Sequence, residues 1–349
     1  MSLLITGATG FIGKRLISEL NDYQGEIFII VREHSIRKAI SLFKNHPRVQ
    51  IIIGDITNIN VLDDDNDLKL LKQVKEIIHL AGKYDIEMNR KDSYIHNIVG
   101  TQNIINLMDK IPSCERFHLI SSFSVVGTKK LIAGPDDFAN KEELLSNYSY
   151  SKMVAEKIAR KSFQSIPHVK LIIYRPGIVI PSMGDKLDKI DGPFYFIQNL
   201  VKYENVINYL PSVFSLVFPY AKEAYLPLIT VDSVVDFICS KINQKSTSKV
   251  TTSFYITGQS KQIIYNFMKD VFFVFEKNVD VKPIPRFIGR KFRLNFKMIP
   301  QELVSFGYFE TKLYDQKTPE ESQIIEKRNK YRASDMIRQV KDFVGGVQK

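Results

Sequence analysis

The stretch that decides the fold is LLITGATGFIG, residues 3–13. Its apolar start predicts a short strand, its glycines predict a tight turn, and the amphipathic run 11–20 predicts a helix. Glycines at this spacing let backbone amides approach a pyrophosphate at the helix N-terminus, where the helix dipole favours negative charge. The pattern predicts a dinucleotide-binding turn. The cofactor contacts expected from it are Thr6, Gly7, Thr9, Gly10, Phe11, Ile12 and Gly13.

Apolar runs and helical patterns alternate from this turn onward. The further runs are 27–31, 49–53, 76–80, 117–121 and 169–174, and the helical patterns include 89–110 and 147–161. Short apolar runs separated by helices are typical of buried parallel strands with crossover helices. We therefore expect an α/β protein with a doubly wound parallel (Rossmann) sheet and a smaller C-terminal substrate lobe.

The alternation weakens after Pro176, where prolines and glycines become frequent. We expect a dinucleotide-binding domain over 1–180, to which 228–258 returns. Residues 181–227 and 259–349 then form the substrate lobe. The pair Gly345-Gly346 predicts the end of the last helix.

Composition narrows the class of protein. The 49 basic residues exceed the 38 acidic ones by 11, which favours an acidic partner such as a phosphorylated small molecule, an anionic membrane face or a nucleic acid. The chain has only two cysteines, no signal-peptide pattern and no apolar run long enough to span a membrane, so we expect a cytoplasmic protein. The six histidines are scattered without ligand spacing, and we expect no metal site.

The end of the second strand bears on the choice of dinucleotide. An NAD-specific site places an acidic residue there, whereas this chain has Arg32, which can bind a 2′-phosphate. Glu33 follows one step later and could serve as the acidic residue. We favour NADP (NADPH) over NAD. Asp55 and Ile56 follow the third strand, where a carboxylate suits the adenine amino group, although Asp55 could also be a helix N-cap.

Three residues form a candidate catalytic set. Tyr148 and Lys152 lie four apart on a predicted helix and so share one face, where the ammonium would lower the pKa of the phenol. Lys152 can also bind the nicotinamide ribose. Ser122 follows the fifth strand, where a hydroxyl can donate to a substrate carbonyl oxygen, although it could instead cap a turn.

The ordered motifs together resemble the extended short-chain dehydrogenase/reductase family. They are TGATGFIG at 6–13, Asp55, HLAG at 79–82, Asn97, SSFSVVG at 121–127, YSYSK at 148–152 and RPG at 175–177. The resemblance implies that Ser122 binds the substrate oxygen, Tyr148 donates the proton and Lys152 holds the ribose. It also implies that Ala81, Gly82, Pro176 and Ile178 contact the cofactor.

Two further segments are similar to the reductase domain of bacterial fatty acyl-CoA reductases, in the male-sterility and thioester-reductase branch. They are YRPGIVI at 174–180 and DKIDGPFYF at 188–196. This resemblance implies NADPH-dependent reduction of an acyl-CoA or other acyl thioester to the aldehyde. Many bacterial members carry a second reductase domain, for which 349 residues leave no room. The alternatives are a ketone or aldehyde reductase, a sugar-nucleotide epimerase or dehydratase, and a non-enzymatic dinucleotide sensor.

The last notable segment is RFIGRKFRLNFKMI, residues 286–299. At helical spacing, Arg286, Arg290, Arg293 and Lys297 fall within a narrow arc, which predicts a basic amphipathic helix. The helix either packs on the lobe or makes a peripheral contact at the inner face of an anionic membrane. We expect no nucleic-acid partner.

Overall fold

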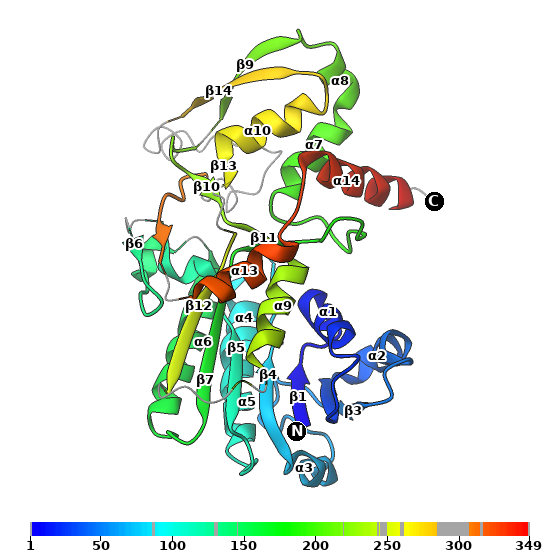
Figure 1. Ribbon diagram of the computed structural model, residues 1–349, viewed down its shortest axis with the longest axis vertical. Helices are drawn as coiled ribbons and strands as arrows, with labels where there is room; N and C mark the ends of the chain where they lie inside the picture. Colours follow the sequence, from blue (N-terminus) through cyan, green and yellow to red (C-terminus); the bar gives the residue numbers. More distant parts are fainter. Residues whose placement is uncertain are drawn as a thin grey trace.

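The computed structural model describes residues 2–85, 88–128, 132–144, 146–218, 220–242, 244, 250–258, 262–284, 307–314 and 317–347. A parallel sheet with its helices forms the lower part of the molecule, and a smaller lobe stands above it (Figure 1). The expected α/β architecture is confirmed. The predicted basic helix at 286–299 lies outside the described residues.

The main sheet has seven parallel strands in the order β12-β7-β5-β4-β1-β2-β3. Strands β1, β2 and β5 are buried along their whole length, as a sheet covered on both faces requires. The strand order reverses between β1 and β4, and ligands bind beyond the strand ends at such a point. The strands are β1 (Ser2–Thr6), β2 (Ile27–Val31), β3 (Val49–Ile53), β4 (Val74–His79), β5 (Arg116–Ile120), β7 (Lys170–Pro176) and β12 (Thr251–Ile256).

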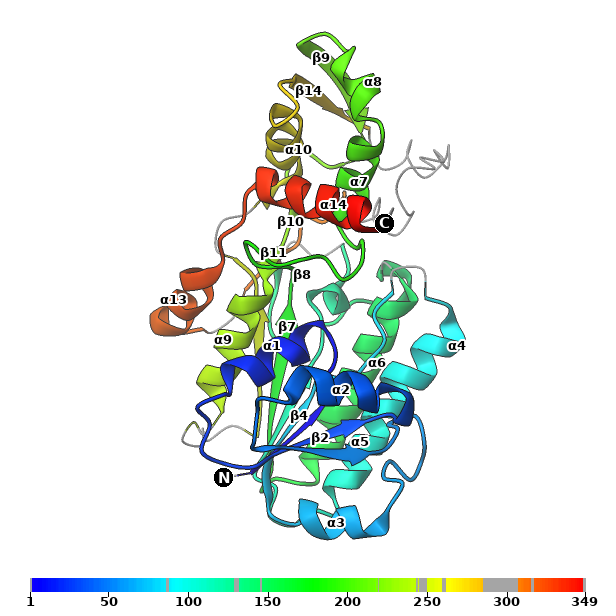
Figure 2. The same cartoon turned by 90° about the vertical axis from the view of Figure 1, so that its right-hand side faces the viewer.

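Helices cover both faces of the sheet (Figure 2). Alternate residues of β1 separate the two cores, with Leu3 packed toward α1, α2 and α9 and Leu4 packed toward α3, α5 and α6. The helices are α1 (Phe11–Glu19), α2 (Ile36–Phe43), α3 (Asp65–Leu71), α4 (Arg90–Ser93), α5 (Gly100–Met108), α6 (Asn147–Gln164) and α9 (Val231–Lys241).

The lobe has its own hydrophobic core, formed by α7, α8, α10 and α14 with the strand pair β9–β14. Its elements are α7 (Phe194–Lys202), α8 (Glu204–Asn208), β9 (Val213–Phe218), α10 (Ile264–Phe273), β14 (Asn278–Pro283) and α14 (Ala333–Val347). Short pairs join the two parts: β8 (Ile178–Ile180) with β11 (Leu228–Thr230), and β10 (Tyr225–Leu226) with β13 (Gln262–Ile263).

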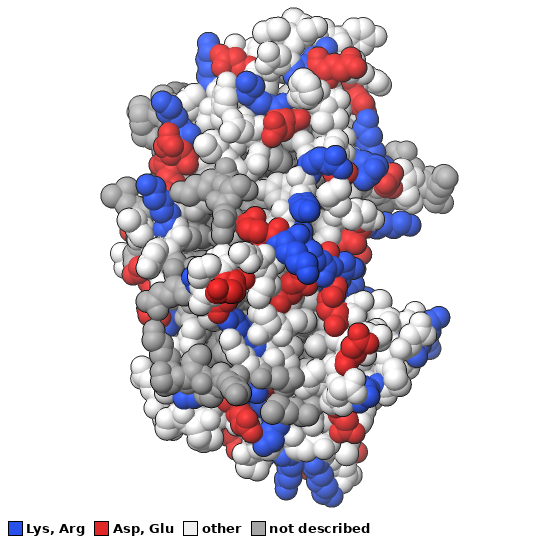
Figure 3. All heavy atoms as spheres, viewed as in Figure 1, with Lys and Arg blue, Asp and Glu red and all other residues white. Residues whose placement is uncertain are grey.

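Residues 312–313 and 319–328, assigned to the lobe by the sequence pattern, lie against the sheet part. Strand β15 (Lys312–Leu313) pairs with β6 (Ile132–Ala133), and α13 (Pro319–Arg328) packs on α9. Arg328 of α13 forms ion pairs with Asp232 and Asp236 of α9 and with Glu19 of α1. Basic and acidic side chains accordingly gather at the middle of the face shown in Figure 3. The chain thus crosses back to the sheet before α14 returns to the lobe.

Two local expectations differ from the structure. The single helix predicted over 89–110 is divided into α4 and α5 by a π-helical segment, Tyr94–Val99. The predicted stop at Gly345-Gly346 is wrong, because α14 continues through both glycines to Val347. No described helix is long and apolar enough to cross a membrane.

Candidate active site

A cavity of about 760 Å³ lies between the sheet and the lobe. Its walls come from the ends of β1, β2, β3, β4 and β5, from the start of α6, and from the lobe segment 187–194. The space-filling view shows the molecule hollowed at its right-hand edge, between α2 below and α14 above (Figure 3). The cavity is therefore at the strand ends, where a doubly wound sheet binds its ligand.

Close backbone packing at the first turn explains its glycines. Gly7 has a φ of +75°, and a Cβ there would stand 2.6 Å from the Ala81 amide nitrogen. A Cβ on Gly13 would stand 2.2 Å from the Gly7 carbonyl oxygen. Gly10 is the N-cap of α1 and offers no capping side chain, and the first turn of α1 has no acidic residue. The amides at this helix start are thus suited to a pyrophosphate.

Basic and hydroxyl side chains line the cavity beyond β2, where the adenosine end of a dinucleotide is expected. Arg32 lines the cavity after β2, and Ser35 and Lys38 line it from the following helical segment. Glu33 is exposed and is not part of the lining. Asp55 lines the cavity too, while its Oδ1 accepts hydrogen bonds from the Thr57 amide at 2.8 Å and the Thr57 hydroxyl at 2.9 Å.

Ser122, Tyr148 and Lys152 line the opposite end of the same cavity. Ser122 caps the 3₁₀ turn Phe123–Val126, where its Oγ accepts from the Ser124 amide at 3.2 Å and lies 2.9 Å from the Ser124 Oγ. Ser122 is also hydrogen-bonded to the Tyr148 hydroxyl. Ser122 thus caps the turn and also lines the cavity, and its contact with a substrate oxygen stays a prediction.

Burial shifts the pKa values of Tyr148 and Lys152 in opposite directions. It raises the pKa of Tyr148 above its ordinary value, an effect that the Ser122 hydrogen bond only partly opposes, and it lowers the pKa of Lys152 to about 8. The direction for Tyr148 is opposite to the one expected from its spacing to Lys152. A phenol with a raised pKa stays protonated at neutral pH, as a proton donor must.

The residues behind the site are fixed by hydrogen bonds. Asn97, in the π-helical segment, accepts from the Lys83 amide at 2.8 Å and donates to the Lys83 carbonyl at 3.1 Å and to the Ser151 hydroxyl at 2.9 Å. Thr6 is buried and does not line the cavity. Its hydroxyl lies 2.7 Å from His79 Nδ1 and accepts from the Ala81 amide at 3.3 Å. Thr6 therefore connects the end of β1 to the end of β4 by hydrogen bonds, and it is a structural neighbour of the cavity.

The segment DKIDGPFYF lines the cavity and also contacts Tyr84, a lining residue that the sequence interpretation did not single out. The Tyr84 ring lies edge-on to Tyr148 at 4.7 Å between centroids. Its hydroxyl is hydrogen-bonded to Asp191, and Lys189 Nζ donates to the Tyr84 carbonyl at 3.2 Å. The lobe thus closes over the catalytic end through these contacts.

All the predicted site residues except Thr6 line the cavity. They are Gly7, Thr9, Gly10, Phe11, Ile12, Gly13, Arg32, Asp55, Ile56, Ala81, Gly82, Ser122, Tyr148, Lys152, Pro176 and Ile178. The lining residues that sequence reasoning missed include Ser35, Lys38, Tyr84 and Asp191. Ser35 and Lys38 had a local signal, because they follow Arg32 on the next helix.

A family model described as male sterility protein matches residues 5–238. A 3 beta-hydroxysteroid dehydrogenase/Delta 5-->4-isomerase of Mycobacterium tuberculosis is 30% identical over 161 residues, 44% of this chain and 41% of the relative. A UDP-glucose 4-epimerase of Pisum sativum is 26% identical over 183 residues, 50% of this chain and 51% of the relative. The chain spans about half or less of the length of these curated relatives.

Solved structures share the fold over almost the whole chain. The terminal R domain from the myxalamid PKS-NRPS biosynthetic pathway matches with a TM-score of 0.73 and 18% identity, covering 99% of this chain and 91% of that one. UDP-glucuronic acid 4-epimerase from Bacillus cereus, in complex with UDP-glucuronic acid and NAD, matches with a TM-score of 0.64 and 18% identity, covering 99% and 100%. At such identities the likeness is one of fold.

Proposed function

The chain belongs to the male sterility protein family, among the extended NAD(P)-dependent short-chain dehydrogenases and reductases, and we propose that it reduces an acyl thioester to the aldehyde with NADPH. The observation that carries the proposal is that one cavity holds both ends of the candidate site. It joins a basic nucleotide end at Arg32 to a Ser122–Tyr148–Lys152 end, and it is walled there by the segment 187–194. The fold likeness to a terminal R domain supports the same branch of the family.

The proposed preference for NADPH rests on the side chains at the adenosine end. Arg32 and Lys38 supply two positive charges and Ser35 supplies a hydroxyl, which together suit a 2′-phosphate. Glu33, the competing acidic residue, is exposed outside the lining. The pyrophosphate fits the glycine turn, and the nicotinamide ribose fits Lys152.

The side chains at the other end would act on the acyl carbonyl. The hydride comes from NADPH when it is bound. Ser122 donates a hydrogen bond to the carbonyl oxygen, and Tyr148 donates a hydrogen bond and then its proton, so that negative charge does not accumulate there. When the carbon–sulfur bond then breaks, the hydroxyl formed on the same carbon returns its proton to Tyr148, and the departing thiolate takes a proton from solvent. One NADPH and one proton are consumed for each aldehyde and thiol released.

A sugar-nucleotide epimerase is the second candidate, because epimerases occur among both the curated relatives and the solved structures. Such an enzyme would recycle its nucleotide with no net oxidation. The cationic adenosine end counts against it, since NAD has no 2′-phosphate to bind there.

The test is to incubate the protein with NADPH and short-, medium- and long-chain acyl-CoAs, following NADPH absorbance and free thiol together. We expect one thiol per NADPH oxidised, with Tyr148→Phe as the inactive control. Oxidation with simple aldehydes but with no thioester would make the protein a carbonyl reductase. Conversion of a UDP-sugar without net NADPH loss would make it an epimerase.

A further inference from the structure

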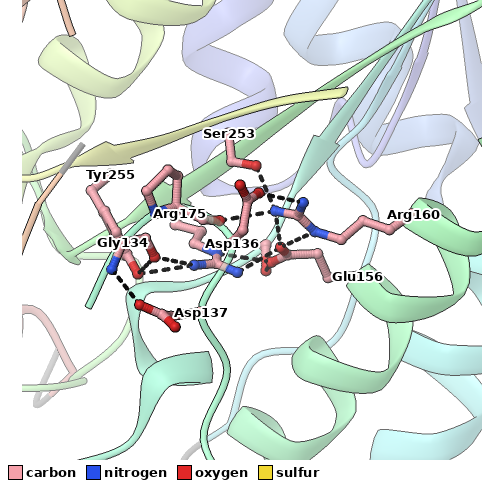
Figure 4. Close-up of polar contacts among 10 residues, drawn as sticks. Gly134, Asp136, Asp137, Glu156, Arg160, Arg175, Ser253 and Tyr255 are labelled. Atoms are coloured by element: carbon pink, nitrogen blue, oxygen red, sulfur yellow. Dashed lines mark hydrogen bonds and ion pairs between the residues drawn. The ribbon is translucent and has the colours of Figure 1, made fainter. Parts of the chain in front are cut away.

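A cluster of buried charges joins α6 to β7 (Figure 4). Its centre is the Glu156 carboxylate of α6, which is fully buried. Arg175 of β7, also fully buried, donates to it twice, from Nη2 at 2.7 Å and from Nε at 3.1 Å. The Ser121 hydroxyl donates to the same carboxylate at 2.5 Å, and Arg160 Nε donates at 2.9 Å.

Members of the cluster are close in sequence to the candidate catalytic residues on both β5 and α6. Ser121 precedes Ser122 at the end of β5, and Glu156 follows Lys152 by one helical turn on α6. Arg175 precedes Pro176, which lines the cavity. One carboxylate therefore connects the three elements that carry the site.

This arrangement goes beyond what fold stability requires. Burying a carboxylate and a guanidinium costs several kcal/mol per ion, and apolar residues of similar volume often serve stability as well or better. An ion pair with several hydrogen-bond donors instead fixes the relative orientation of its members. Here the Glu156 carboxylate accepts from both Arg175 and Ser121, which fixes these side chains relative to α6. Arg175 is oriented in turn by the Tyr255 hydroxyl, which accepts from it at 2.9 Å and itself donates to the Gly134 carbonyl at 2.9 Å.

We propose that Glu156 is a positioning residue, which holds the Ser121–Ser122 end of β5 against the face of α6 that carries Tyr148 and Lys152, and which places its negative charge one helical turn from Lys152. The activity part of this inference rests on the proposed reductase function, whereas the charge part concerns the protein alone.

Glu156 is a negatively charged neighbour of Lys152, because side chains four apart on a helix lie on one face. Tyr148 lies one turn before Lys152 on α6, His79 approaches from β4, and Asn97 flanks it next to Gly82. Burial lowers the pKa of Lys152 to about 8, and the charge of Glu156 acts against that effect. His79 is held neutral, because burial lowers its pKa to about 3. Loss of the Glu156 charge would therefore leave Lys152 deprotonated over more of the neutral range.

The test compares Glu156→Gln with Glu76→Gln. Glu76 is a matched control, since it is also fully buried and paired with an arginine, Arg116, at 2.6 Å. Its partners Arg116 and His118 do not line the cavity, whereas Ser121, a partner of Glu156, does. The first readout needs no substrate. The rate at which a small acylating reagent modifies the Lys152 amine is measured against pH by mass spectrometry. In Glu156→Gln the midpoint should move to lower pH by about half a unit or more, and in Glu76→Gln it should not move.

The second readout is kcat and KM in the reductase assay. Glu156→Gln should lower kcat by about tenfold to a hundredfold and shift the alkaline limb of its pH profile downward, with the dissociation constant of NADPH within about threefold of wild type. Ser121→Ala removes only the hydroxyl link and should lower kcat with no shift of the Lys152 midpoint. This variant decides the positioning part if Glu156→Gln does not fold.

An unshifted Lys152 midpoint in folded Glu156→Gln would overturn the charge part. Wild-type kcat in Ser121→Ala would overturn the positioning part. Because the acylation readout uses the protein without substrate, a wild-type protein inactive on thioesters would refute the proposed function and leave the charge part to be judged on its own.

Discussion

The replacement Gly13→Ala probes the nucleotide turn with the smallest available change. A Cβ at this position would stand 2.2 Å from the Gly7 carbonyl oxygen and 2.7 Å from the Ala8 Cα. Ordinary contacts between such atoms lie about 1 Å or more further apart. Both neighbours are backbone atoms, so α1 and the turn must move apart as units. Overpacking of this kind costs about 1–3 kcal/mol in the free energy of unfolding.

The same movement would withdraw the α1 amides from the pyrophosphate. We expect the dissociation constant of NADPH to rise at least about tenfold, equivalent to about 1.4 kcal/mol. The measurements are denaturant unfolding and NADPH titration by fluorescence. The matched control is Gly345→Ala in α14, where a Cβ would meet no atom within 4 Å. There the change should stabilise the protein by about 0.5 kcal/mol, because alanine favours the helix.

The two glycine variants should therefore differ in sign, although the chemical change is identical. If Gly13→Ala unfolds at the wild-type denaturant midpoint and binds NADPH as tightly, the close approach of α1 to the turn does not exist. The assignment of this turn to the nucleotide would then lose its geometric basis.

Four further outcomes are expected. Arg32→Ala should erase most of an NADPH-over-NADH preference of about tenfold or more in titrations, and equal affinities in the wild type would contradict the assignment. Tyr148→Phe should abolish turnover but spare NADPH binding, whereas Tyr150→Phe, outside the cavity lining, should be mild; the reverse order would misplace the catalytic face. Burial alone would raise the pKa of Glu76, but hydrogen bonds from neighbouring basic side chains lower it to about 2, below the ordinary 4.5. Unfolding free energy should therefore fall as pH drops from about 4.5 toward 2, and this part of the dependence should vanish in Glu76→Gln. Replacing Arg286, Arg290, Arg293 and Lys297 with Gln should abolish sedimentation with anionic liposomes at low salt, and a wild-type protein that stays in the supernatant would end the membrane role.

Several features followed from the sequence alone because their causes are local. The strand–turn–helix at residues 3–13 depends only on residues that are adjacent in the sequence, and β1 and α1 form there. The pairing of Tyr148 with Lys152 depends only on helical spacing, and α6 begins at Asn147 as the pattern predicted. The buried parallel strands were evident for the same reason, since a strand covered on both faces must be apolar throughout.

Other features depend on residues that the chain brings together from a distance. Ser121 and Glu156 are 35 residues apart, and each alone looks like an ordinary polar residue after a strand or on a helix. Tyr84 gains its place beside Tyr148 from Lys189 and Asp191, about a hundred residues further along the chain.

The direction of the Tyr148 pKa also came from the tertiary structure. Spacing alone suggested that a nearby ammonium would lower it, but the packed site removes water from the phenol, and this loss of hydration outweighs the opposing effect of the Ser122 hydrogen bond. Periodicity reports which face of an element is buried, because burial repeats with the local backbone geometry. Periodicity carries no information about which distant side chain contacts that face. At this site such contacts decide the charges and the shape of the cavity.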